Sequence, residues 1–334
     1  MKVAGRRALR LIVGALVALA AVFAFAGNVE WSLVFAAVGS ARPMWTVAAI
    51  ASVLLTLSLV TLRWGRLLDR EPSSAPTVGI ACGRARSRVL WDAVVLGQAV
   101  NILVPLRFGE GVRLAVTSRG LHVQAGRVMV GLALERLLDV AAFATIVAML
   151  VVGGWMPRAF QRLLPTAVTL ALATLVAALL LVRLLPTVLT WLQARRFRVL
   201  APAASWIDQQ SAAMREGWVD VTRRHQLGRI TVLTALIPVT AAATNYLVLR
   251  SFNVPVPVVT ALVLLVVLQI GTAVVSVPGN VGVFHYLILV TLAAWDVSQP
   301  TAVAVAIVLH IVSLGPKVVL GAFCFRGYFR AETR

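Results

Sequence analysis

Charged side chains interrupt the apolar segments of this sequence at two places, and their types suit recognition of a phosphate. In the first place, Arg107, Glu110 and Arg113 follow one another at intervals of three residues. On a helix that starts near Arg107 they would share one face. An arginine guanidinium is a planar fork that fits two phosphate oxygens, and Glu110 could hold the arginines in place or exchange a proton. The same spacing also fits a salt-bridge ladder at the start of a cytoplasmic helix.

The second place is the stretch LALERLLDV, in which Glu135, Arg136 and Asp139 lie inside a long apolar run. Spacings of three and four residues would direct all three side chains to the interior of a helical bundle. A charged side chain at the centre of a bilayer costs at least about 2.5–3.5 kcal/mol on insertion scales, so such residues are candidates for function. The alternative is a structural ion cluster that fixes this helix to its neighbours.

Two histidines and a lysine also lie in apolar surroundings. His285 follows the second interrupted stretch, in GNVGVFHY, and His310 lies in the last apolar run. A single histidine on an apolar helix is usually a core residue, whereas two on adjacent elements could pair, relay a proton or bind a metal. A metal would need more ligands than the sequence offers, so we predict neither metal nor cofactor. Lys317 fits a side chain that extends to the cytoplasmic interface.

The elements that carry these residues are predicted to be membrane helices. The chain has 334 residues, of which 60% are hydrophobic, and a mean hydropathy of +0.93, which excludes an ordinary soluble domain. A helix needs about 20 apolar residues to cross a bilayer. The apolar runs near this length are Leu9–Ala26, Trp45–Leu62, Val128–Val152, Thr166–Pro186, Ile230–Leu249 and Ala302–Phe325. The first could also be a signal peptide, but no clear small-residue cleavage site follows it.

The distribution of charge predicts the orientation of these helices. The formal net charge is +19, from 31 Lys and Arg against 12 Asp and Glu, and most arginines fall between the apolar runs. The positive-inside rule therefore accounts for them without a nucleic-acid partner, and predicts a multi-pass protein of the cell membrane with both termini cytoplasmic. A basic amphipathic loop at about residues 187–229 would lie against anionic headgroups. The arginines assigned to the cytoplasmic loop after the second run are Arg63, Arg66, Arg70, Arg84, Arg86 and Arg88.

Two further apolar stretches, Leu96–Arg113 and Leu268–Tyr286, each contain a glutamine and then a Pro-x-x-x-Gly break. Counting crossings makes Trp91–Gly126 begin and end in the cytoplasm, and makes Val258–Trp295 begin and end outside. Both are therefore predicted to be re-entrant hairpins, although ordinary proline-kinked spanning helices are the alternative. Irregular backbone at membrane depth must be buried in protein or face a wet cavity. The predicted turn residues are Pro105, Gly109, Pro278, Gly279 and Gly282.

Together these patterns predict an all-α polytopic membrane protein. We expect a single integral membrane domain over residues 1–334, with about six spanning helices and the two re-entrant hairpins. The two breaks are about half the chain apart, which is typical of an inverted repeat, here of about residues 1–152 and 164–327. In such folds the interrupted helices meet near the midplane, where the site lies. The candidate substrate-binding residues are Asn101, Arg107, Glu110, Arg113, Glu135, Arg136, Asp139, His285 and His310.

At these residues the sequence resembles the lysylphosphatidylglycerol synthase transmembrane-region family, also called the flippase-like domain family. The matching patterns are N-x-x-x-P-x-R-x-G-E-x-x-R over Asn101–Arg113, L-E-R-x-x-D over Leu134–Asp139 and P-G-x-x-G-V-F over Pro278–Phe284. The resemblance covers nearly the whole chain and implies a bundle of about eight membrane segments. In the founding proteins this region moves an aminoacylated anionic phospholipid between leaflets and precedes a soluble aminoacyl-transferase domain.

The present sequence departs from that family in two respects. It ends at Arg334, directly after its last predicted span, so we expect no aminoacyl-transferase domain and assign no lysyl transfer. The family usually has Glu at the position of His285 and often Arg at that of His310. If the two positions form a pair, a His–His contact has replaced an ion pair, and a histidine titrates near pH 6.5.

The function predicted from the sequence is that of a membrane lipid translocase. Its substrate would be an anionic or lipid-linked, phosphate-containing lipid, held by Arg107 and Arg113 in a cavity between the hairpin tips. No ATP-binding motif occurs in the sequence, so movement would be passive or ion-coupled. The alternatives are a membrane-embedded transferase-like enzyme acting on lipid-linked substrates, and an accessory subunit of a separate synthase. The sequence also leaves open whether the chain assembles with further copies of itself.

Overall fold

The computed structural model describes residues 30–69, 83–104, 108–156, 224–274 and 278–332, and a few isolated positions between 169 and 212. All regular elements in these residues are helices. They are α2 (Trp31–Ser40), α3 (Pro43–Leu67), α4 (Arg84–Leu103), α5 (Gly109–Leu121), α6 (Ala125–Val152), α10 (Arg224–Ser251), α11 (Val259–Val274), the short 3₁₀ helix η2 (Pro278–Asn280), α12 (Val283–Ala293) and α13 (Gln299–Glu332). The all-α fold predicted from the sequence is therefore confirmed.

Several predicted features lie outside the described residues. Leu9–Ala26 lies wholly outside them, and Thr166–Pro186 lies almost entirely outside them. The same holds for most of the basic loop at about residues 187–229, because α10 begins only at Arg224. Pro105 and Arg107 also fall in a gap of the description.

Within the described residues, three helices are long and apolar enough to cross a membrane: Pro43–Leu67, Leu227–Ser251 and Gln299–Gly327. Each contains one of the predicted apolar runs. The fourth long helix, α6, is continuous over the predicted run Val128–Val152 and carries the LERLLD charges. Helix α3 starts with a proline, whose fixed φ and missing N–H suit the first turn of a helix. The helices α3 and α10 pack along each other, and α13 contacts α2, α4 and α12.

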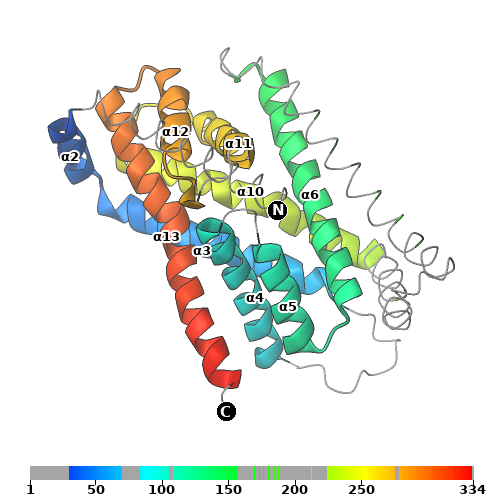
Figure 1. The fold of residues 1–334 in the computed structure, drawn as a ribbon. Helices are drawn as coiled ribbons and strands as arrows, with labels where there is room; N and C mark the ends of the chain where they lie inside the picture. The colour runs from blue at the N-terminus through cyan, green and yellow to red at the C-terminus, as the bar shows by residue number, and fades with distance from the viewer. Residues whose placement is uncertain are drawn as a thin grey trace, which may run out of the picture.

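The first interrupted stretch forms a hairpin of α4 and α5, whose re-entry from the cytoplasm stays a prediction. The two arms approach closely because glycines face each other: a Cβ on Gly97 or on Gly109 would meet the carbonyl oxygen of the other. Helix α4 begins at Arg84 rather than at Trp91, so the predicted loop between the second run and this hairpin is partly helical. In Figure 1 the open end of this hairpin lies at the lower end of the bundle, beside the C-terminal half of α13.

The second interrupted stretch forms the hairpin α11–η2–α12. Its turn needs glycine, because Gly279 and Gly282 adopt φ values of 65° and 83°. Figure 1 shows this hairpin at the upper end of the bundle, with η2 directed toward the middle. Helix α4 contacts η2, so the breaks of the two hairpins meet inside the bundle. The inverted repeat that this arrangement fits, and the pseudo-repeat boundaries, remain predictions.

Two apolar clusters hold the bundle together on either side of this meeting point. One joins α3, α10, α11, α12 and α13 through residues such as Val53, Leu264 and Leu309. The other joins α3, α4, α5, α6 and the start of α10 through residues such as Trp64 and Ile230. Between the two clusters, α10 carries threonines and alanines in the stretch 240–244, and α3 carries Thr56 beside the buried Leu57. These stretches form the wall of an internal cavity.

Candidate functional site

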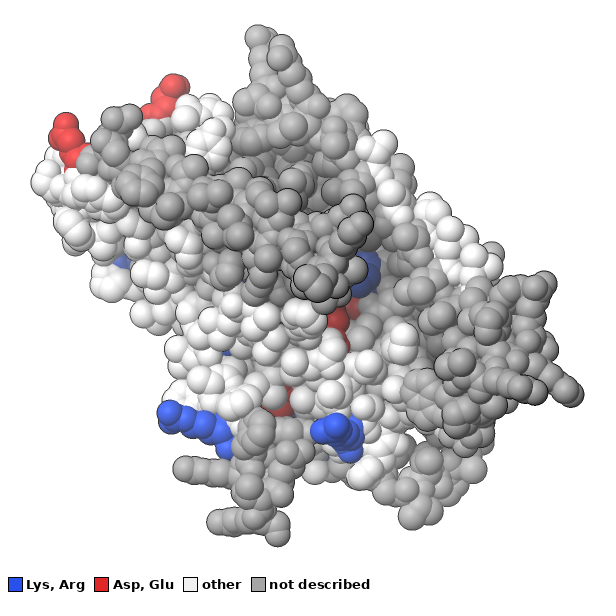
Figure 2. All heavy atoms as spheres, viewed as in Figure 1, with Lys and Arg blue, Asp and Glu red and all other residues white. Residues whose placement is uncertain are grey.

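The central cavity has a volume of about 400 Å³ and is lined by residues of α3, α4, α5, α6, α10, α11, η2 and α13. A smaller hollow of about 230 Å³ adjoins it and shares Thr56, Gln269, Thr272, Asn280 and Lys317 with it. Figure 2 shows acidic and basic atoms meeting in a recess near the middle of a described surface that is otherwise largely uncharged. Charged groups of both signs thus lie together in this cavity.

The structure brings together the two charged groups that the sequence predicted separately. Glu110 and Arg113 line the cavity from α5. Glu135, Arg136 and Asp139 line it from α6. Helix α5 begins at Gly109, close to the predicted start, so Glu110 and Arg113 lie on one face as expected. The cavity-lining members of the predicted set are Asn101, Glu110, Arg113, Glu135, Arg136 and Asp139.

The centre of the cluster is a buried ion pair. Arg113 donates two hydrogen bonds of 2.8 Å to the two carboxylate oxygens of Glu135, and both residues are buried. The guanidinium of Arg113 also lies 4.3 Å from the centre of the Trp64 ring, which is a cation–π contact. A two-point arginine–carboxylate pair fixes the geometry of both side chains. Arg113 is therefore held in place before any ligand arrives.

The outer part of the cluster is more accessible. Arg136 donates a hydrogen bond to Glu110 and a second one of 3.4 Å to Asp139. The side chains of Arg136, Glu110 and Asp139 retain 45%, 32% and 32% of their exposure, against 5% for Arg113. These three groups therefore present the charges that a ligand in the cavity would meet first.

Arg63 is a member of this cluster that the sequence analysis assigned wrongly to the basic cytoplasmic loop. Helix α3 continues to Leu67, which carries Arg63 into the protein with 1% exposure. Its Nη2 lies 2.7 Å from Asp139 Oδ1 and 3.5 Å from Glu135 Oε1, and Nη1 donates to Thr234. Arg63 directly follows an apolar run, where the positive-inside rule expects a loop arginine. LERLLD contains two carboxylates and one arginine. This excess of negative charge in an apolar run was the sequence signal for a further cation.

Asn101 serves the backbone of the hairpin as well as the cavity wall. Its Oδ1 accepts a hydrogen bond of 2.8 Å from the backbone N–H of Gly109, the first residue of α5. The first N–H groups of a helix have no partner within the helix, so this side chain satisfies one of them. Asn101 thereby ties the end of α4 to the start of α5 across the break.

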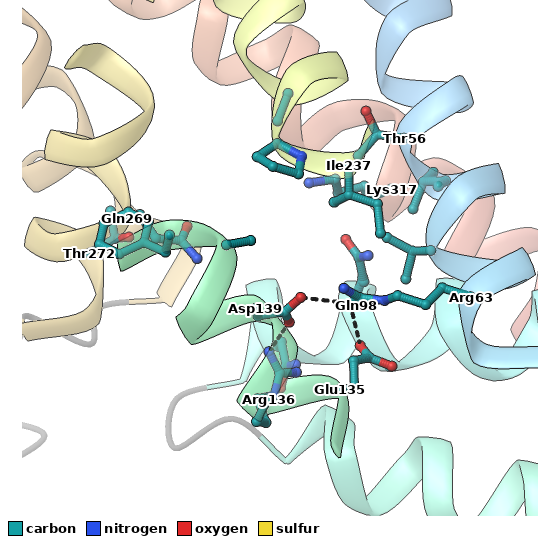
Figure 3. Close-up of a pocket in the computed structure, with 18 of the residues that line it drawn as sticks. Thr56, Arg63, Gln98, Glu135, Arg136, Asp139, Ile237, Gln269, Thr272 and Lys317 are labelled. Atoms are coloured by element: carbon teal, nitrogen blue, oxygen red, sulfur yellow. Dashed lines mark hydrogen bonds and ion pairs between the residues drawn. The ribbon is translucent and has the colours of Figure 1, made fainter. Parts of the chain in front are cut away.

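Further polar residues of the cavity wall were not among the predicted site residues. Gln98 lies on α4, Gln269 and Thr272 lie on α11, and Thr56 lies on α3. Figure 3 shows Gln98 beside Arg63, and Gln269 and Thr272 on the wall formed by α11. The matching glutamines of the two interrupted stretches were the sequence signal for this wall.

Lys317 also lies on the cavity wall, and not at the cytoplasmic interface where the sequence analysis put it. It projects from α13 four residues, or about one helical turn, after Ser313, which also lines the smaller hollow. In Figure 3 it lies across the cavity from Gln269. The lysine falls one residue after Pro316, well inside the apolar part of α13.

The two predicted histidines contact each other outside this cavity. The rings of His285 and His310 stack, with their centres 4.7 Å apart and their planes 23° apart. Phe284, which lines the smaller hollow, packs edge-on against His310. The pair therefore lies between α12 and α13. Among the residues that the structure describes, no three His, Cys, Asp or Glu side chains are grouped as metal ligands.

The fold and the cavity define an all-α membrane protein with a cluster of ion pairs inside its helical bundle. The chain matches the family described as lysylphosphatidylglycerol synthase TM region over residues 11–321, and it belongs to that family. This membership indicates a lipid-related function in a membrane. Searches of the curated proteins and of the solved structures each found no match.

Proposed function

We propose that this chain is a lipid translocase that moves an anionic or lipid-linked, phosphate-containing lipid between the leaflets of the cell membrane. The observation that carries the proposal is the cavity lined by charges of both signs at the point where the breaks of the two hairpins meet. The family supports a lipid-related role but does not by itself distinguish a translocase from an enzyme.

The chemistry of the cavity suits a headgroup that must leave water. Moving a charged headgroup through the bilayer is slow because its charge must be desolvated. Glu110, Arg136 and Asp139 remain partly exposed in the cavity, so they could replace lost water with charged hydrogen bonds. The acyl chains would stay in contact with the apolar outer faces of the helices. Movement of one hairpin relative to the other would expose the cavity to either side in turn, with passive or ion-coupled transport.

The ion pairs favour a translocase over a membrane-embedded transferase. Glu135 and Asp139 are the carboxylates that such an enzyme would use as a nucleophile or metal ligand. Arg63 contacts both of them, and Arg113 occupies both oxygens of Glu135. Carboxylates held in this way are suited to positioning arginines. Arg107, which was predicted to hold the phosphate, remains a candidate for that role.

The test is transbilayer movement of fluorescent phosphatidylglycerol in proteoliposomes, measured by quenching of the outer leaflet with a membrane-impermeant reductant. We expect wild-type protein to accelerate movement, and Glu110→Gln and Asp139→Asn to slow it about tenfold or more, because each change removes a charge from the cavity. Arg119→Ala is the matched control, since Arg119 is an exposed residue on α5 outside the cavity.

The result that contradicts the proposal is equal movement with wild-type protein and with protein-free vesicles, across anionic and lipid-linked phosphate lipids. Mass spectrometry of the same vesicles, supplied with a labelled lipid-linked donor, tests the enzyme alternative. A new lipid product that Asp139→Asn does not form would favour that alternative. Activity that requires a co-purifying synthase would instead favour an accessory role.

A further inference from the structure

The charges that line the central cavity do not balance. The described lining contains the carboxylates Glu110, Glu135 and Asp139, and the cations Arg63, Arg113, Arg136 and Lys317. Each carboxylate lies within 4.0 Å of an arginine nitrogen. Lys317 has no such carboxylate among the residues that the structure describes. With four cations against three anions, the described lining has a formal charge of +1, and this excess lies at Lys317.

The surroundings of Lys317 offer further hydrogen-bonding groups that are not in use. Gln98 on α4 and Gln269 on α11 line the same cavity, and neither side chain has a hydrogen-bond partner among the described residues. A carboxamide offers two N–H donors and an acceptor oxygen. Lys317 and Gln269 also line the smaller hollow, so they border both parts of the cavity. Figure 3 shows Gln98, Gln269 and Lys317 on different walls around the same space.

The two buried arginines, Arg113 and Arg63, are less free to bind a ligand than this lysine. Arg113 has both terminal nitrogens on Glu135, and Arg63 is divided between Glu135 and Asp139. A lysine ammonium is a compact charge with three donors on a flexible stem. A cation inside an apolar bundle is costly without an anion beside it. An anionic ligand at Lys317 would remove that cost.

We propose that Lys317, together with the carboxamides of Gln98 and Gln269, forms a phosphate-binding subsite in this cavity. The arginine–carboxylate cluster then shapes the wall, and the lysine supplies the attraction for the anion. The inference rests on the proposed translocase function. It assigns the phosphate contact to Lys317 in place of Arg113. The ligand class is a phosphate ester or free phosphate, whose oxygens would accept from the ammonium and the amide N–H groups.

The experiment measures thermal stabilisation of the purified protein in detergent by short-chain, soluble dihexanoyl phosphatidylglycerol. Dihexanoyl glycerol, which lacks the phosphate, and inorganic phosphate are run beside it. We expect wild type to be stabilised by the phospholipid but not by the neutral lipid. Lys317→Gln should weaken the apparent affinity about tenfold or more, because a charged hydrogen bond is lost. Lys317→Arg should retain stabilisation, and Gln269→Leu should show a smaller loss.

Arg326→Gln is the matched control, because it removes one positive charge from the same helix at an exposed position outside the cavity. Equal stabilisation of wild type and Lys317→Gln, or of wild type by both lipids, would overturn the subsite. Stabilisation by inorganic phosphate alone, lost in Lys317→Gln, would keep the subsite and assign it to a soluble phosphate.

The vesicle assay separates this inference from the proposed function. Transport by wild type that persists unchanged in Lys317→Gln would overturn the subsite and leave the translocase standing. Lysine-dependent binding without transport by wild type would overturn the translocase and leave the subsite standing.

Discussion

At the scale of single residues, the buried pair of Arg113 and Glu135 makes the site both rigid and sensitive to charge. Each group replaces the water that the other has lost, and Arg63 shares the same carboxylate. Such a pair contributes little net stability compared with well-packed apolar residues, but removing one partner leaves the other buried and uncompensated. The pair therefore fixes the position of charge more than it strengthens the fold.

Glu135→Gln should consequently lower the free energy of unfolding by about 3–5 kcal/mol, since it leaves Arg113 and Arg63 with an excess of buried positive charge. Thermal unfolding of the purified protein in detergent measures the change. Asp296→Asn is the control, because Asp296 is exposed and its positive φ of 55° suits asparagine. An unchanged melting temperature for Glu135→Gln would mean that water or another group already compensates the arginines.

At the scale of the elements, the α4–α5 hairpin depends on the absence of side chains where its arms meet. A Cβ on Gly97 would contact the side chain of Arg113 as well as the carbonyl oxygen of Gly109. The close approach of the arms and the position of the arginine are therefore set by the same glycine. Asn101, one turn further along α4, ties the two arms together by accepting a hydrogen bond from the backbone N–H of Gly109.

Gly97→Ala should separate the two arms and displace Arg113, and so reduce both thermal stability and lipid movement. Gly111→Ala is the matched control on α5, because a Cβ there has no heavy atom within 4 Å. In a helix interior alanine is favoured over glycine by about 1 kcal/mol, so the control should be neutral or slightly stabilising. Equal behaviour of the two variants in unfolding and vesicle assays would refute the role of Gly97.

The helices and hairpins could be predicted from the sequence because their signals are local. Runs of apolar residues, the Pro-x-x-x-Gly breaks and the spacing of charges all lie within short segments. The partners of Arg63 and Lys317 could not be predicted in this way, because their contacts join helices far apart in the sequence. For Arg63, a loop position and a buried one give the same local pattern: an arginine after an apolar run. Gln98 and Gln269 recur at matching places in the two interrupted stretches. That they line one cavity could not be predicted, because it depends on the contact between the two breaks.

At the scale of the whole molecule, the distribution of charge is asymmetric. The open end of the α4–α5 hairpin carries Arg84, Arg86, Arg88 and Arg119, and Arg326 lies near the C-terminal end of α13. Glu30 and Asp296 lie next to the elements at the opposite end, and Figure 2 shows acidic atoms there. The positive-inside rule predicts that the arginine-rich end faces the cytoplasm.

Labelling of single cysteines in cells tests this orientation, in a protein whose Cys82 and Cys324 have been replaced by serine. Asp296→Cys should react with a membrane-impermeant maleimide in intact cells. Arg119→Cys should react only after the membrane has been permeabilised, because it lies at the opposite, basic end. The reverse pattern would show that the protein is inserted the other way, and reaction of both in intact cells would contradict the topology.

The ion pairs also divide the bundle into parts with different freedom to move. Among the described residues, the pairs at the cavity join α3, α5 and α6, and none of them reaches α11, α12 or α13. The first three helices are thus coupled to one another by directional bonds, whereas the last three are held mainly by apolar packing, which permits sliding. A change in access to the cavity would then come from movement of the α11–α12 hairpin and α13, while α3, α5 and α6 stay fixed relative to one another.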